Sequence, residues 1–248
     1  MLFRIARMVP SSTPSRGGPW AANSHFLELA GREAYAVRMK HDDTNAQGGA
    51  APVRDRVTRI ADFLFECGML RKTPRTGYQF LGSGSENVAE HSFRTAVIGY
   101  VLARMADADE ARTTLLCLFH DLHEARTGDF NYVNRIYNSS TRTMALEHAT
   151  AGTGLADELL PMWEELEAVQ TLEAQLAQDA DQLDFILNLK EEADMGNRYA
   201  TQWLELAVQR VRTKWGQELA ETIARTDHKD WWFLGPDPEW WVRKNGKK

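Results

Sequence analysis

Residues 115–124 read LLCLFHDLHE, and this stretch governs how the rest of the sequence is interpreted. Five apolar residues lead directly into His120 and Asp121, so we expect a helix that is buried on most sides and continues to about residue 125. An unpaired carboxylate at the inner end of such a helix would cost on the order of several kcal/mol, and a bound cation would remove that cost. Glu124 follows His120 by four residues and therefore projects on the same side of the predicted helix.

The ordinary alternative for an isolated His-Asp pair is a core histidine that is hydrogen-bonded to its neighbouring aspartate. Two further segments count against it. Glu90-His91 lies near the start of the preceding predicted helix, and residues 179–184, DADQLD, open a later apolar helix. Two imidazoles and two carboxylates from separate helices suit one divalent ion and leave positions for water and substrate. Helix bundles build metal sites in this way, so the sequence predicts a metal centre.

Helical periodicity also dominates the rest of the chain. In residues 54–69, Val57, Ile60 and Leu64 recur on one face, whereas no alternating strand pattern of useful length and no internal repeat is present. The sequence therefore predicts an all-α protein, a bundle of roughly seven or eight helices. The expected helices cover residues 54–69, 86–105 (with Ser85 as the candidate cap), 109–125, 141–150, 159–169, 181–194, 200–213 and 217–224.

Gly-rich and Pro-rich stretches divide the chain into three parts. We expect residues 1–52 to be a flexible N-terminal tail, because residues 45–52 are rich in Gly and Ala, end in Pro, and precede the first steady helical pattern. Residues 53–226 are expected to form the core. Residues 227–248 form an aromatic and then basic C-terminal segment.

Composition excludes several classes of protein. Apolar residues make up 43% of the 248 residues and charged residues 26%, which excludes collagen, coiled-coil and wholly disordered chains. A net charge of −6 argues against a stable nucleic-acid partner, and no apolar run of about 18 residues exists that would span a membrane. Cys67 and Cys117 lie among apolar residues and are expected to be reduced thiols. These features predict a cytoplasmic protein.

The order His, His-Asp, Asp resembles the ligand pattern of the HD-domain metal-dependent phosphohydrolases, and the closer resemblance is to their 5′-deoxynucleotidase branch. The resemblance covers roughly residues 53–195 and rests on four motifs in the same order. They read PRTGY at residues 74–78, ENVAEH at 86–91, HDLHE at 120–124 and TGD at 127–129.

The resemblance implies four ligands for one divalent cation, which would be Mn, Co, Fe, Ni, Zn or Mg. These ligands are His91, His120, Asp121 and Asp181. Asp181 matches the family's Ala-Asp-x-Leu pattern at residues 180–183, with Asp184, one helical turn further, as the alternative. Asp179 is expected to cap its helix instead.

The resemblance also assigns roles around the ion. It implies that Glu124 is the acid/base residue, that Asp129 lies near the sugar or the attacking water, and that Arg75 contacts the phosphate. His123 is expected to be solvated or to lie just outside the ligand set.

The activity implied is metal-dependent hydrolysis of the 5′-phosphomonoester of a (deoxy)nucleoside monophosphate. The alternatives are a dNTP triphosphohydrolase or another HD-domain nucleotide phosphohydrolase, and a non-catalytic metal-binding module. A triphosphate pocket should need several more cations near the ion. Residues 71–78 supply three, and the candidate additions are Arg126, Arg135 and Arg142.

The tryptophans point to self-association. Four of the eight lie near the C-terminus, where a small helical core leaves limited room to cover them. We therefore expect a homo-oligomer, most simply a homodimer.

Overall fold

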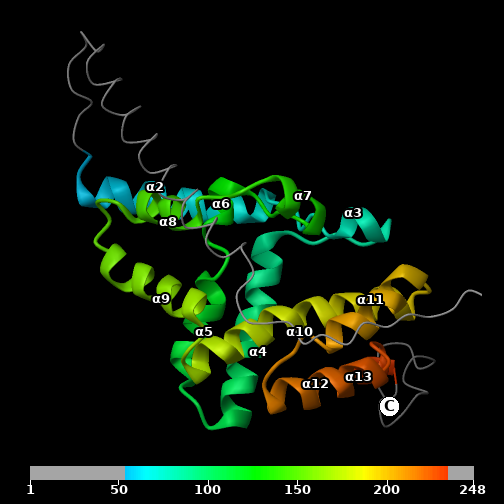
Figure 1. Ribbon diagram of the computed structural model, residues 1–248. Coiled ribbons are helices and arrows are strands. Elements are labelled where there is room, and N and C mark those ends of the chain that lie inside the picture. The colour runs from blue at the N-terminus through cyan, green and yellow to red at the C-terminus, as the bar shows by residue number, and fades with distance from the viewer. Residues whose placement is uncertain (1–53, 234–248) are drawn as a thin grey trace, which may run out of the picture. The chain divides into compact units, whose positions relative to one another are not determined.

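The computed structural model describes residues 54–233, and this range is helical with no strand (Figure 1). The prediction of an all-α fold is confirmed. Eight helices in the range have nine or more residues: α2 (Arg56–Cys67), α4 (Val88–Ala106), α5 (Glu110–Phe119), α8 (Arg142–Thr150), α9 (Ala156–Ala168), α10 (Leu172–Asp194), α11 (Arg198–Val208) and α12 (Lys214–Arg225). The shorter helices are η1 (Gly68–Lys72), α3 (Tyr78–Leu81), α6 (Glu124–Thr127), α7 (Tyr132–Tyr137) and α13 (Asp230–Phe233).

Two of the predicted parts fall largely outside this range. The predicted tail, residues 1–52, and most of the C-terminal segment lie outside the described residues. Within residues 54–233, none of the helices combines the length and the apolar character that a membrane span requires.

Helix α10 is the centre of the packing. It contacts α4, α5, α9, α11 and α12, and Figure 1 shows it crossing α4 with α11 and α12 alongside. Leu183, Ile186 and Leu189 of α10 are fully buried, as are Leu102 of α4 and Leu116 of α5. Burial of each such side chain stabilises the fold by roughly 1.5–3 kcal/mol. The elements that carry the predicted ligands are therefore held by the core itself.

Helix α10 begins at Leu172, well before the predicted start at residue 181. Thr171 caps it by accepting a hydrogen bond from the N–H of Ala174 at 3.1 Å. The predicted start was wrong because three of the five apolar residues in 172–180 are alanines, which make the apolar face of this part of the helix weak in the sequence. The acidic residues of the 179–184 segment consequently lie in the middle of a rigid helix rather than at its end.

Helix α4 begins at Val88 with a capping box. The side chain of Asn87 accepts from the N–H of Glu90, and the Glu90 carboxylate accepts from the N–H of Asn87, both at 3.0 Å. Asn87 therefore takes the capping place that was predicted for Ser85. The box fixes the first turn of α4, which contains His91.

The predicted helix over residues 109–125 is interrupted. Helix α5 ends at Phe119, residues 120–123 form a turn, and α6 follows. The α-helical pattern stops because the N–H of Leu122 donates to the carbonyl of Phe119 at 3.2 Å, and that of Glu124 to the carbonyl of Asp121 at 2.9 Å, each three residues back. His120 and Asp121 therefore lie on the turn beyond a helix end, where both side chains can face the same side. Helix α7 also falls within residues 126–140, which were predicted to be a loop.

Candidate metal centre and pocket

Ligand atoms of His91, His120 and Asp181 all lie within 4.8 Å of one another, and a carboxylate oxygen of Asp121 lies close to both imidazoles. Nε2 of His91 lies 3.1 Å from Nε2 of His120 and 3.2 Å from Oδ1 of Asp181. Oδ2 of Asp121 is 3.1 Å from Nε2 of His120 and 3.6 Å from Nε2 of His91. The structure thus brings together all four residues predicted as ligands, from α4, the turn after α5, and α10.

The other ring nitrogens show which atoms face the cluster. Nδ1 of His91 lies 2.6 Å from Oδ2 of Asp184, and Nδ1 of His120 lies 2.6 Å from the carbonyl oxygen of Cys117. Each partner is an acceptor only, so each Nδ1 carries a proton and donates it. Where a cation replaces the second proton, each imidazole keeps only its Nδ1 proton and Nε2 of both rings presents a lone pair.

The convergence of these lone pairs calls for a cation. Two imidazole lone pairs and two carboxylate oxygens at such distances repel one another unless positive charge lies between them. Burial lowers the pKa of His91, but the carboxylates of Asp181 and Asp184 outweigh it and raise that pKa to about 10. Metal-ligating histidines typically donate their second nitrogen to a carboxylate or a carbonyl, as both do here. The residues present therefore fit a divalent metal ion.

Asp184 contacts the ring of His91 on the side that faces away from the cluster. It is fully buried and contacts Nδ1 of His91, on the opposite side of the ring from Nε2. Arg94 donates to its other carboxylate oxygen, and Nδ2 of Asn188 lies 3.3 Å from Oδ2. Within the described residues, this places Asp181 among the converging atoms and Asp184 on the far side of the imidazole.

Asp179 does not cap its own helix, contrary to the prediction. Its buried carboxylate accepts hydrogen bonds from the backbone N–H of Arg212 at 2.9 Å and of Thr213 at 2.7 Å. A Cβ on Gly216 would come within 2.6 Å of Oδ2 of Asp179, so the glycine permits this close approach. Asp179 therefore fixes the start of α12.

Arg75 lies against the carboxylates of the cluster. Its NH1 is 3.3 Å from Oδ2 of Asp121, and its NH2 is 3.9 Å from Oδ1 of Asp181. Asp129 holds this loop in place, because its Oδ2 accepts from the backbone N–H of Thr76 at 2.7 Å. The PRTG and TGD motifs therefore meet in space.

Glu124 is buried, with 4% of its surface exposed, and its Oε2 has no hydrogen-bond partner within residues 54–233. Burial, with the charges of Asp121 and Asp129 as the next causes, raises the pKa of Glu124 to about 9. A buried carboxylate oxygen without a hydrogen-bond partner lowers the stability of the fold, and such groups are found at catalytic sites. Glu124 is not among the residues that line the pocket described below.

His123 is buried, so the first of the two positions expected for it, the solvated one, is wrong. Its ring packs edge-on against Trp163, with ring centroids 4.9 Å apart. Burial lowers the pKa of His123 to about 4. His123 therefore belongs to the core beside the turn.

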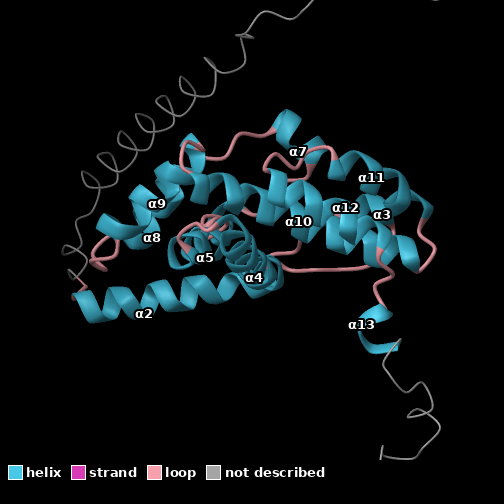
Figure 2. Ribbon diagram, turned by 90° about the horizontal axis from the view of Figure 1, so that it is seen from below, coloured by secondary structure: helices cyan, strands magenta, loops and turns pink. Residues whose placement is uncertain are grey.

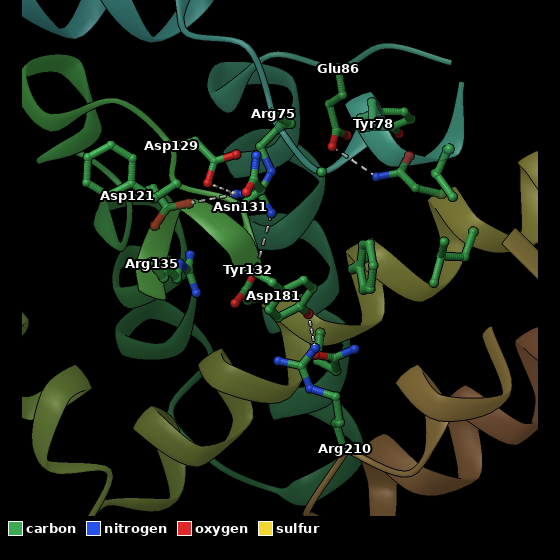
Figure 3. A pocket seen from close by; sticks show the side chains of 17 residues that line it. Arg75, Tyr78, Glu86, Asp121, Asp129, Asn131, Tyr132, Arg135, Asp181 and Arg210 are labelled. Atoms are coloured by element: carbon green, nitrogen blue, oxygen red, sulfur yellow. Dashed lines mark hydrogen bonds and ion pairs between the residues drawn. The ribbon is translucent and has the colours of Figure 1, made fainter. Parts of the chain in front are cut away.

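A pocket opens beside the ligand cluster (Figure 3). Its lining includes the cluster residues Asp121 and Asp181 together with Arg75 and Asp129. The rest of the lining is Gly77, Tyr78, Leu81, Glu86, Phe130, Asn131, Tyr132, Arg135, Gln182, Phe185, Asn188, Leu189 and Arg210.

The cations of this pocket differ from those expected. Arg135 lines it as a predicted candidate, whereas Arg126 is ion-paired with Glu66 and Arg142 lies 3.4 Å from a carboxylate oxygen of Glu167. Arg210 was missed because it follows α11, far from every motif in the sequence. Arg94 was missed for a different reason: it is one turn beyond His91, at a spacing that indicates proximity but not a role.

Helix bundles in which imidazole and carboxylate side chains meet between facing helices are a known class of metal-binding protein, and the present site has this form. A profile of the HD domain family matches residues 67–223. Since this is more than half of the chain, the chain belongs to the HD domain family.

Two relatives are similar over the same part of the chain. The 5′-deoxynucleotidase HDDC2 of Danio rerio is 28% identical over 138 residues, which are 53% of this chain and 68% of that protein. The 5′-deoxynucleotidase HDDC2 of Dictyostelium discoideum is 28% identical over 148 residues, 54% of this chain and 78% of that protein.

Solved structures share the fold. A conserved hypothetical protein of Pyrococcus furiosus is similar with a TM-score of 0.57 and 26% identity, over 67% of this chain and 99% of that one. A predicted metal-dependent phosphohydrolase of Magnetospirillum magnetotacticum is similar in fold with a TM-score of 0.53 and 22% identity, over 69% of this chain and 94% of that one.

Proposed function

We propose that this protein is a metal-dependent phosphohydrolase that removes the 5′-phosphate from (deoxy)nucleoside monophosphates. The observation that carries the proposal is the convergence of ligand atoms of His91, His120 and Asp181, with Asp121 and Arg75 beside them at the edge of a pocket. Membership of the HD domain family and the similarity to two 5′-deoxynucleotidases support the same activity.

His91, His120, Asp121 and Asp181 would hold the ion. A divalent cation bound there supplies positive charge to the phosphate and activates water for attack. The imidazole ligands suit Zn, Co, Ni or Fe, and the carboxylates also suit Mn and Mg. Asp184 and the carbonyl of Cys117 keep both Nε2 atoms available by holding the proton on each Nδ1.

Arg75 binds the phosphate in this proposal. Its guanidinium already lies between three carboxylates, and a phosphate oxygen that entered beside them would receive two of its N–H donors. Asp129 positions the loop that carries Arg75. The apolar and aromatic side chains that line the pocket further out suit a nucleoside.

Glu124 moves the proton, either from the attacking water or to the leaving oxygen. The basis is its buried carboxyl group with one unpartnered oxygen, three residues after Asp121. Asp129 is the second candidate for this step, since it lines the pocket and Glu124 does not.

A substrate screen tests the proposed function. The full chain is stripped of metal, refilled with one divalent ion at a time, and assayed against dNMPs, NMPs and dNTPs. We expect inorganic phosphate from monophosphates, only with metal present. Release of pyrophosphate or triphosphate would support the triphosphohydrolase instead, and a chain that binds metal but hydrolyses none of the nucleotides would be a non-catalytic module.

The cellular setting is also proposed. Cys67 and Cys117 are free thiols, consistent with a cytoplasmic protein that has a nucleotide substrate and no stable nucleic-acid partner. Trp231 is 85% exposed, which supports the homodimer expected from the tryptophans. A monomeric mass by light scattering at micromolar concentration would refute the dimer.

A further inference from the structure

The two ends of the pocket differ in chemical character. At one end lie Tyr78 and Leu81 of α3 with Phe185 of α10. Phe185 is placed beside α3 because it and Phe80 both contact the ring of Trp203, with centroids 6.4 Å apart in each pair. This end offers flat apolar surfaces.

Arg135 and Arg210 form the other end. In Figure 3 both arginines lie on the side of the cluster away from Tyr78 and Glu86, with Asp181 between. A ligand that follows the pocket from the aromatic end would therefore pass Asp181 and Arg75 before it reaches these two guanidinium groups.

Neither guanidinium is neutralised by a carboxylate within residues 54–233. Arg135 has no hydrogen bond or ion pair to a described residue, and the only polar partner of Arg210 is the hydroxyl of Tyr132. Arg75, by contrast, lies within 4.0 Å of a carboxylate oxygen of Asp121, of Asp129 and of Asp181. The charges at this end of the pocket are thus available to a ligand.

Both arginines are related to Tyr132 of α7. Arg210 stacks on the ring of Tyr132 at 5.5 Å and donates to its hydroxyl, which joins α7 to the segment after α11 across the pocket. Arg135 follows Tyr132 by three residues, so the two side chains share one face of α7.

We infer that Arg135 and Arg210 form an anion subsite for the second phosphate of a nucleoside 5′-diphosphate. Its first phosphate would lie at the metal centre with Arg75, and its nucleoside at the aromatic end. Planar guanidinium groups match phosphate oxygens in pairs. A 5′-phosphate chain extends away from the nucleoside, as the two arginines do, whereas a 3′-phosphate would lie at the aromatic end. The inference rests on the proposed function and widens the class of ligand that the site accepts.

Calorimetric titration of the full chain, loaded with Mn²⁺ at low ionic strength, tests this subsite. The probes are the 5′-methylenephosphonate analogues of deoxyadenosine monophosphate and of its α,β-methylene diphosphate. In both, a CH₂ group replaces the 5′-ester oxygen, so the bond that the proposed activity breaks is absent. We expect the diphosphate to bind about tenfold more tightly. In Arg135→Ala and in Arg210→Ala that ratio should fall several-fold. Arg225→Ala is the matched control, because it removes an exposed arginine of α12 that lies outside the pocket.

A diphosphate binds a divalent ion more tightly than a monophosphate does even without the arginines. The test therefore depends on the affinity ratio of Arg135→Ala compared with that of Arg225→Ala. Equal ratios in these two variants would overturn the subsite while leaving the proposed function intact. A wild-type chain that binds no monophosphate would instead overturn the proposed function, and the subsite with it. A 3′,5′-bisphosphate that gains affinity through Arg135 would refute the assignment to a 5′-diphosphate.

Discussion

The metal cluster and the arginine end of the same pocket are built in opposite ways. His91 is fully buried on a capped 19-residue helix, and Asp184 and Arg94 hold its ring from behind. Arg135 and Arg210 are exposed, one on the six-residue helix α7 and the other in the segment between α11 and α12. One region is fixed by the core, and the other depends on one contact between Tyr132 and Arg210.

This difference corresponds to the two functions that we propose for the site, which are binding of the metal ion and selection of the ligand. Groups that must converge on one ion need fixed rings and satisfied partners, because a shift of about 1 Å spoils coordination. Groups that select a ligand can lie on short exposed elements, where substitution costs little stability. Changes in the cluster should therefore alter metal content and folding together, whereas changes at the arginine end should alter ligand preference alone.

The largest effect is expected from His120→Ala. Loss of one of four ligands should abolish metal retention, and stability should fall because metal binding contributes to folding. An ion present at about 1,000 times its dissociation constant stabilises the fold by about 4 kcal/mol. Metal content by mass spectrometry and thermal unfolding with and without chelator are the measurements. His148→Ala, a change on α8 away from the cluster, is the control.

The chelator provides the sharper comparison for His120. Unfolding of the wild type should shift to a lower temperature when EDTA is added, and unfolding of His120→Ala should not respond. Full metal content in the variant, or a response to EDTA equal to that of the wild type, would show that His120 is no ligand.

Glu124→Gln should have the next largest effect, and on the rate rather than on metal content. The amide keeps the shape of the side chain but cannot accept a proton as a carboxylate does, so turnover of deoxynucleoside monophosphates should fall about 10²- to 10⁴-fold. Metal content and hydrolysis are measured on one preparation. Glu158→Gln, an exposed change on α9, should leave both unchanged.

Either of two results would remove this role from Glu124. Loss of metal in the variant would make it a ligand, which would enlarge the buried cluster. Near-normal turnover would leave Asp129 as the group that moves the proton.

The sequence predicted the cluster better than the pocket, for physical reasons. His120-Asp121 after five apolar residues signals a buried polar group, and burial demands a partner, so a metal centre could be predicted there, while the set of four ligands was implied by the family resemblance. Arg210 carries no such signal, since an exposed arginine in a polar segment is ordinary. Its position depends on how α11 and α12 pack on α10, which local patterns do not encode.

The same reasoning explains which helices were predicted. Helix α2 lies within the predicted range of 54–69, but the predicted apolar face was wrong in part, because Val57 and Leu64 are exposed and Phe63 is the buried residue. The first half of α10 was missed because its buried positions are mostly Ala, and the turn at residue 120 was missed because hydrophobicity does not report where an α-helical hydrogen-bond pattern stops.

Asp184→Asn should lower the metal affinity moderately. The size of this change distinguishes a residue that positions His91 from one that binds the metal ion. The amide can still accept the proton of His91 Nδ1 but lacks the negative charge that raises the basicity of the ring, so metal affinity should fall about 10- to 100-fold. Competition with a fluorescent chelator measures this affinity. Asp181→Asn is the comparison and should be the more damaging change. The reverse order would exchange the roles of the two aspartates.

The smallest effect is expected from deletion of residues 1–51. All the residues assigned to the metal cluster and to the arginine end of the pocket lie between Arg75 and Arg210. Two Gly-rich and Pro-rich stretches also separate that part from the helical pattern that begins after Pro52. A chain that starts at Pro52 should therefore keep its metal content, its turnover of monophosphates and the ratio of diphosphate to monophosphate affinity.

The three measurements distinguish the ways in which this prediction can fail. A loss of metal would mean that residues 1–51 stabilise the cluster. A change confined to the affinity ratio would mean that they complete the exposed end of the pocket, which is the region that the comparison marks as tolerant of change. A halved mass in light scattering with unchanged turnover would place them instead in the contact between two copies of the chain.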